Sequence, residues 1–173
     1  MAFRITNALA GSQPIATTST VQNHPLGKIV TAYDPILGEG EFIYLKGVAS
    51  TAAGLMVYYD VNTGTTALTT TSLGLNRGQP LAVAMSANVA SQYGWYQIGG
   101  AATILKTAVK YDPASSTLGA SVHLSGTAGR VMQTSASLRQ ILGARFASAT
   151  TVTSTTSTVI VTINRPVQQG KIT

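Results

Sequence analysis

Short runs of β-branched and aromatic residues, separated by Gly, Pro, Asn or Asp, recur along most of this 173-residue sequence. The Gly, Pro, Asn and Asp residues interrupt the runs every eight to twelve residues or so, and the periodicity of an amphipathic helix is nearly absent. Because such spacing is typical of sheets closed by tight turns, we predict an all-β protein, an antiparallel sandwich or barrel. The predicted strands span residues 28–33, 41–48, 55–60, 65–69, 81–85, 93–98, 102–110, 120–125, 130–134, 140–147 and 157–163.

The segment 137–148 is ambiguous between helix and strand. Leu138, Ile141 and Leu142 would line one helical face, but Gly143 would cost a helix about 1 kcal/mol. We therefore predict a strand over 140–147. The Thr-rich stretch 148–158 that follows is low in complexity and is predicted to be a loop or an exposed edge.

The first 25 residues show little periodicity, and we predict that they form an extended N-terminal arm. A chain of this length forms one core and buries roughly 68–70% of its unfolded surface. We therefore expect two parts, an arm over residues 1–25 and a single β-sandwich domain over residues 26–173. A floppy terminus is the alternative to an arm that lies on a neighbouring subunit. The apolar residues that would anchor such an arm are Phe3, Ile5, Ile15 and Val21.

The chain carries very little charge. Charged residues make up 9% of it and hydrophobic residues 45%, with a mean hydropathy of +0.23, whereas globular proteins average about 25% charged. A free monomer usually depends on interspersed surface charge for solubility. Either other protein chains cover much of the surface, or this is a Thr-rich β-protein that tolerates low charge.

The net charge of +6 does not by itself indicate a nucleic-acid partner. The eleven Lys and Arg residues are scattered singly, without the basic run or stripe that phosphate binding requires. The charge fits an acidic protein surface equally well. The chain has no cysteine, which excludes disulfides, thiol catalysis and Cys-type zinc sites. With no apolar run of membrane-spanning length and no secretory signal, we expect a soluble protein made in the cytoplasm.

Three predicted strands, 41–48, 55–60 and 93–98, carry apolar side chains on both faces. They hold seven of the eleven aromatic residues, although a sandwich strand needs only one apolar face. Cover on the second face implies another layer or another subunit, and Tyr, Trp and Met are enriched at interfaces. We therefore predict an oligomer. The candidate interface residues are Phe3, Ile5, Ile15, Phe42, Tyr44, Tyr58, Tyr93, Trp95 and Tyr96.

Patterns that carry chemistry are missing from the sequence. There is no G-x-S-x-G elbow, no H-E-x-x-H or EF-hand metal motif and no phosphate-binding glycine loop. The two histidines, His24 and His123, are predicted to be structural rather than catalytic. We predict no catalytic residues, no cofactor, no metal and no enzymatic activity.

Three of the five acidic residues, Asp34, Glu39 and Glu41, lie close together. The two glutamates would point the same way on an extended chain, so they would not straddle a sugar bond as glycosidase carboxylates do. Asp34, Asp60 and Asp112 each follow a tyrosine at a strand end, which predicts turn residues. The turn after Asp60 is expected to place Gly64 in the left-handed region. Glu39 and Glu41 are then solubilising residues on the loop that enters the next strand.

Several segments resemble those of a known family when they are taken together. They are "HPLGKIVTAYDPILGEGEFIYLKGVAST" (24–51), "AVAMSANVASQYGWYQIGG" (82–100), "LGARFAS" (142–148) and "INRP" (163–166). In this order and spacing they resemble the head-decoration, or capsid cement, proteins of tailed bacteriophages. The resemblance spans residues 13 to 166.

This resemblance implies a jelly-roll-like β-sandwich without enzymatic activity that binds the outer surface of the phage head. Such a protein bridges subunits of the major capsid protein and stabilises the shell. The implied partners are the major capsid protein and further copies of the chain, as a homodimer or homotrimer. The implied location is the exterior of the virion, after synthesis in the bacterial host cytoplasm.

Three other functions stay open. A receptor- or carbohydrate-binding module of a head or tail fibre would use exposed Tyr93, Trp95 and Tyr96 to stack on sugar rings. A DNA-binding protein of the capsid interior would show salt-dependent binding to DNA. The chain could also be a β-domain without a role in a virion.

Overall fold

The computed structural model describes residues 4–5, 11–48, 51–70, 78–87, 90–107, 118–147 and 157–170. The elements in these ranges are all strands, which confirms the all-β prediction. They are β1 (Arg4–Ile5), β2 (Thr18–Ser19), β3 (Ile29–Asp34), β4 (Gly38–Lys46), β5 (Met56–Tyr59), β6 (Thr66–Leu68), β7 (Leu81–Ala84), β8 (Tyr93–Leu105), β9 (Ser121–Leu124), β10 (Val131–Met132), β11 (Gln140–Phe146) and β12 (Thr158–Gln168).

Each predicted run overlaps an observed strand. The runs 93–98 and 102–110 merge into one strand, β8, and residues 108–110 lie outside the described residues. The strand predicted for 140–147 is confirmed as β11. Gly143 adopts a φ of 75° there, at an irregularity in the pairing with β12. Most of the Thr-rich stretch 148–158 lies outside the described residues.

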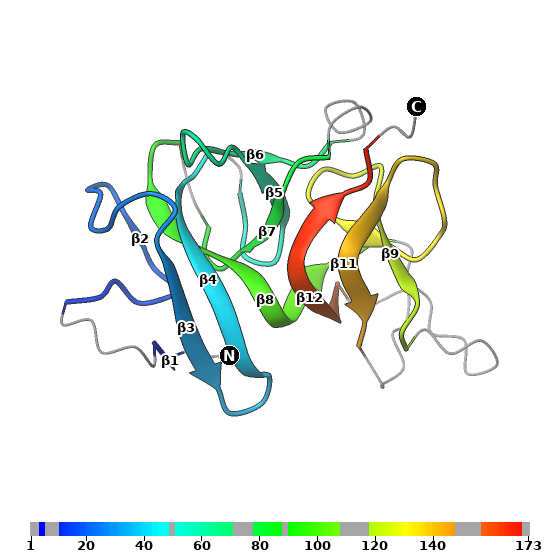
Figure 1. The fold of residues 1–173 in the computed structure, drawn as a ribbon, viewed down its shortest axis with the longest axis horizontal. Helices are drawn as coiled ribbons and strands as arrows, with labels where there is room; N and C mark the ends of the chain where they lie inside the picture. Colours follow the sequence, from blue (N-terminus) through cyan, green and yellow to red (C-terminus); the bar gives the residue numbers. More distant parts are fainter. Residues whose placement is uncertain are drawn as a thin grey trace.

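The strands form one antiparallel sheet that curls into a half-barrel (Figure 1). Its main path runs β1-β3-β4-β8-β12-β11-β9-β10, and β7 joins the β5–β6 pair to β8. The strand β8 is central, since it pairs with β4 along one edge and with β7 and β12 along the other. The antiparallel all-β class is thus confirmed, while the hydrogen bonding is continuous rather than split between two sheets.

Two adjacent glycines let β8 bend where its partner changes from β7 to β12. Gly100 has a φ of 91°, and a Cβ at this position would overlap the carbonyl oxygen of Glu39 on β4. The pairing with β4 shifts register beside this point, between Glu41 and Phe42. The buried Gln97 side chain donates to the carbonyl oxygens of Gly99 and Ala101, both at 3.0 Å. A glycine at such a place is typical of a bulge or a sharp bend.

Three clusters of buried apolar residues form the core on the two faces of the curled sheet. The largest lies between β5 and β7 on one side and β8 to β12 on the other. A second is enclosed by β4, β5, β7 and β8. The third lies on the opposite face of β4 and β8, beneath residues 13–30. Phe42 and Tyr44 face the third cluster, and Ile43 and Leu45 face the second. Within one chain, therefore, the central strands are covered on both faces.

The described part of the N-terminal segment does not extend away as a free arm. β1 pairs with β3 and β2 pairs with β8. Ile15 is 2% exposed and belongs to the third cluster. Of the predicted anchors, only Val21 is strongly exposed among those whose side chains are described, at 67%. Residues 11–25 are thus a cover for the sheet of their own chain.

Candidate functional site

An aromatic cluster occupies the adjoining ends of β4 and β8. Tyr44 and Trp95 are opposite one another in the register, with ring centroids 5.0 Å apart, and both are fully buried. Tyr93 stacks on Tyr44 with ring centroids 6.4 Å apart, and the His24 and Tyr44 rings are nearly perpendicular with centroids 5.0 Å apart. Burial raises the pKa of the Tyr44 phenol, which favours its neutral, hydrogen-bonding form.

Gln13 connects this cluster to the N-terminal segment. Its side-chain oxygen accepts from the Tyr44 hydroxyl at 2.9 Å and from the Asn23 amide at 3.0 Å. Its side-chain nitrogen donates to the Thr17 and Tyr93 carbonyl oxygens. The Trp95 indole donates to the Gln13 carbonyl at 2.8 Å. Every polar group of this buried amide is used, so its arrangement is that of a structural clamp.

The residues predicted to form an interface are mostly core residues. Ile15, Phe42, Tyr44, Tyr58, Trp95 and Tyr96 are each at most 4% exposed. Tyr93 is half-buried, Phe3 lies outside the described residues, and Ile5 is described only by its backbone pairing with Ala32. The assignment of the six buried side chains to an intermolecular surface is therefore corrected. Their apolar pattern on both faces arises because the sheet curls over itself and residues 11–25 cover its back.

The aspartates cap turns as predicted where they are described. Asp34 Oδ1 accepts from the backbone N–H groups of Ile36 and Leu37 at 2.8 and 3.0 Å. Asp60 Oδ1 accepts from Asn62 and Thr63 in the same manner, at 2.8 and 3.2 Å. Gly64 has a φ of 64°, in the left-handed region as predicted. Asp112 lies outside the described residues.

Glu39 and Glu41 lie within β4 rather than on the loop before it, because the β3–β4 hairpin is longer than predicted. They pair with Tyr33 and Thr31, so they share one face of the sheet. Glu41 Oε2 lies 3.4 Å from Arg165 Nε on β12. Arg165 has a φ of 42° in the irregular part of β12, which brings its side chain to β4. This ion pair links β4 to β12.

Both histidines have packed surroundings. His24 Nε2 accepts from the Gln13 backbone N–H at 3.3 Å. His123 is 7% exposed on β9, and within the described ranges its Nδ1 has no hydrogen-bond partner. Burial lowers the pKa of His123, against an opposite effect of backbone groups at Gln133 and Ser121. Among the described residues no three His, Asp or Glu side chains gather as metal ligands.

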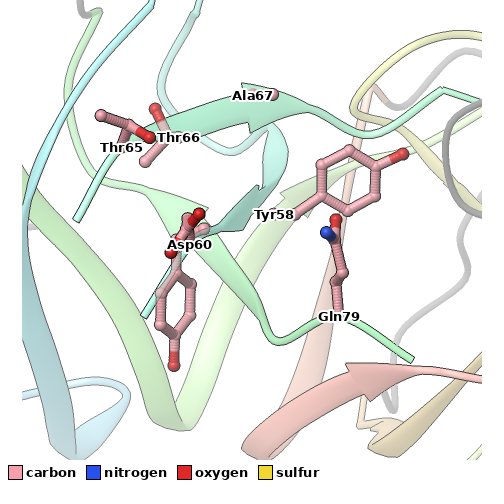
Figure 2. Close-up of a pocket in the computed structure, with 7 residues that line it drawn as sticks. Tyr58, Asp60, Thr65, Thr66, Ala67 and Gln79 are labelled. Carbon is pink, nitrogen blue, oxygen red and sulfur yellow. The ribbon is translucent and has the colours of Figure 1, made fainter. Parts of the chain in front are cut away.

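A small pocket of mixed polar and apolar lining lies beside the β5–β6 hairpin (Figure 2). Its volume is about 210 Å³, and Thr65, Thr66 and Asp60 border it on one side and Tyr58 and Gln79 on the other. Binding sites for drug-sized ligands occupy roughly 300–1,000 Å³. The pocket is smaller than such sites, and Asp60, which lines it, already accepts two backbone hydrogen bonds.

The sequence patterns missed the apolar side chains that are exposed. Ile36 is 81% exposed in the β3–β4 turn, Tyr33 is 51% exposed on β3, and Leu142 is 48% exposed on β11. Turn residues and single strand residues give no periodic signal, so neither period-2 nor aromatic patterns would select them. For Leu142 the sequence offers one indication, because Gly143 follows it and marks a bulge.

The charges are distributed unevenly along the chain. Residues 113–173 contain no Asp or Glu. This part carries five of the eleven basic residues: Arg130, Arg139, Arg145, Arg165 and Lys171. The acids lie instead on and beside β3, β4 and β5, apart from Asp112. A search for basic runs does not find this polarity, because it arises from the absence of acids after Asp112 and not from adjacent basic residues.

Comparison with protein-family models, curated proteins and solved structures gives no match for this chain. In the part of the chain that is described, no helix has the length and apolarity of a membrane span.

Proposed function

We propose that this chain is a non-enzymatic structural protein of a tailed-phage virion, a decoration or cement protein of the capsid. It binds the outer surface of the head and bridges subunits of the major capsid protein. Its proposed partners are that protein and further copies of itself. The burial of the aromatic cluster is the observation that carries the proposal, because it weighs against the carbohydrate-binding alternative.

A carbohydrate-binding module needs aromatic rings that are open to solvent. Trp95 and Tyr96 are 0% exposed, and the Trp95 N–H group is used by Gln13. Tyr93 is stacked on Tyr44. Rings held in this way stiffen a sheet instead of stacking on sugars, which favours a load-bearing role over a fibre module.

The arrangement of strands also suits a protein that carries load. The thirteen-residue strand β8 is hydrogen-bonded on both edges, to β4 on one and to β7 and β12 on the other. We interpret the packing of β5 and β7 against β8 to β12 as sandwich-like and related to a jelly roll. A cement protein resists outward pressure on the shell, and a continuous ladder distributes such a force over many backbone hydrogen bonds.

The surface properties support docking on protein rather than free diffusion. Only 9% of residues are charged, and Ile36, Tyr33 and Leu142 present apolar surface. The net charge of +6 would favour association with an acidic capsid exterior. Binding to purified heads should then weaken as salt rises, and binding insensitive to salt would contradict the electrostatic part of the proposal.

Quantitative mass spectrometry of purified virions tests the proposal directly. A decoration protein is expected in hundreds of copies per particle, at a fixed ratio to the major capsid protein. A handful of copies would instead indicate a fibre or tail component, and absence from the virion would reject both. A glycan array separates the fibre alternative further, since a cement protein should show no sugar binding.

A further inference from the structure

One open face of the sheet presents a carboxylate and a guanidinium at nearly the same level on different strands. Glu39 and Glu41 share a face of β4, and Glu41 pairs with Gly99 on β8. Gly99 pairs in turn with Asn164 on β12. Thr162, two residues before Asn164, pairs with Arg145 on β11. Because directly paired residues face the same side, these positions form one surface, which we call the β4–β11 face.

The side chains of this face are open to solvent. Glu39, Arg145, Thr162 and Asn164 are all exposed. Around Arg145 the surface is hollowed, with a depression of about 330 Å³ lined by Gly143, Ala144, Arg145, Thr162, Ile163 and Asn164. Leu142 is 48% exposed close by on β11. In the middle of the face Gly99 is buried beneath the Glu41 side chain, which meets Arg165 there, so the Glu41–Arg165 ion pair forms the centre of the surface that a partner would contact.

The two charges at the ends of this face have no ionic partner in the described part of the chain. The ion pair found there is Glu41 with Arg165, and neither Glu39 nor Arg145 takes part in one. The Arg145 guanidinium donates to the Ala144 carbonyl at 3.0 Å, which orients it and leaves further N–H donors for a carboxylate.

The register also fixes the spacing of the two charges. Gly40 pairs with Gly100, and Ala101 pairs with Thr162. Glu39 is the residue before Gly40 and Arg145 pairs with Thr162, so the two charges lie within about one residue of the same level on either side of the bend at Gly100. Three strand spacings, about 14 Å, separate them.

We propose that the β4–β11 face is a homodimer interface with two-fold symmetry. A two-fold axis between two such faces, parallel to the strands and over the boundary of β8 and β12, exchanges the positions of Glu39 and Arg145. Each Glu39 then meets the Arg145 of the second copy, and the interface contains this ion pair twice. The occupant is a second copy because the face supplies both halves of the charge match. This inference concerns self-association, and it stands independently of any role on a capsid.

Charge reversal tests the proposal on the full-length protein. In sedimentation velocity, Glu39→Arg and Arg145→Glu should each weaken dimerisation by at least about tenfold, because each places two like-charge pairs in the interface. Mixing the two variants in equal amounts should restore dimers with heterodimeric composition. In such a heterodimer the arginine introduced at position 39 of one chain meets the glutamate introduced at position 145 of the other, and the remaining pair is native.

The matched control is Lys28→Glu, which changes the net charge as Arg145→Glu does, at an exposed residue preceding β3. It should leave dimerisation within about twofold. Thermal unfolding of each variant establishes that it is folded, and Glu39→Gln and Arg145→Gln serve where a reversal fails to fold. A wild-type monomer at about 100 µM would overturn the proposal, as would equal effects of Lys28→Glu and Arg145→Glu. Failure of mixing to restore dimers would also reject the reciprocal pairing.

Discussion

At the residue scale, two buried polar side chains hold segments of the chain in place. Asp34 is 1% exposed and holds the β3–β4 turn by accepting two backbone N–H groups. Gln13 is 6% exposed and fastens the N-terminal segment to the aromatic cluster. The Asp34 carboxylate, a possible catalytic group on sequence grounds, therefore holds a turn instead.

Replacing Asp34 by Ala should lower the free energy of unfolding by about 1–3 kcal/mol, because two turn N–H groups lose their acceptor. Asp34→Asn keeps an oxygen at the accepting position and should recover part of that loss. Asp60→Ala removes an equivalent but exposed cap and should cost less. Urea unfolding at constant m-value measures all three. Equal effects of the Asp34→Ala and Asp60→Ala changes would contradict the role of burial.

Replacing Gln13 by Ala should loosen residues 11–25 while the sheet stays folded. The change removes four side-chain hydrogen bonds and leaves the buried Tyr44 hydroxyl without its acceptor, at a cost of about 1–3 kcal/mol. Trp95 is the sole tryptophan and lies beneath this segment, so its fluorescence should shift to the red and become easier to quench. If the β2 amides exchange hydrogen faster while the Trp95 emission stays unchanged, the loosening does not extend to Trp95 and this part of the prediction is wrong.

At the element scale the bend in β8 determines how the half-barrel is built. The strand pairs with β7 on one side of the bend and with β12 on the other, and two of the three clusters that it contacts depend on this change of partner. Gly100 makes the bend possible by its φ of 91° and by its lack of a Cβ against the backbone of β4.

Gly100→Ala is therefore expected to be among the most damaging small substitutions, with a loss of more than about 3 kcal/mol or failure to fold. Gly38→Ala is a matched control, since Gly38 has a φ of 78° but nothing within 4 Å of the place that a Cβ would occupy. It should show the conformational strain alone, about 1 kcal/mol. If the two variants unfold at the same urea concentration, the steric argument about Glu39 is wrong.

The strands were predictable because their signal is local. The β-branched runs, the Asp34 and Asp60 turns and the strand at 140–147 follow from backbone preferences of neighbouring residues. The cover on the central strands was not predictable in the same way. Phe42, Tyr44 and Trp95 showed that a second layer was needed, but only the curl of the sheet and the docking of Gln13 and Ile15 show that the chain supplies it. Strand pairing brings Glu39 and Arg145 onto one face of the sheet, and their spacing in the sequence does not predict this.

At the scale of the whole molecule, the low content of charged residues affects how stability depends on pH. A chain with 9% charged residues depends on apolar burial and backbone pairing for its stability. The titration of a single buried group then changes the free energy of unfolding measurably, because few other titratable groups oppose its effect. His123, buried on β9 with its Nδ1 lacking a partner in the described part of the chain, is the clearest case in the acid range.

Stability should fall as the pH drops below about 6.5, the usual pKa of an unfolded histidine. Burial lowers the pKa of His123 in the folded state, so the unfolded chain binds more protons between that lowered value and about 6.5. The free energy of unfolding therefore rises with pH in this window, by at most about 1.4 kcal/mol per pH unit. Urea unfolding at pH 7.0, 6.0 and 5.5 measures the slope, and His123→Gln should flatten it above the range where carboxylates titrate. If the slope persists in His123→Gln, another group controls the acid sensitivity and the buried imidazole does not.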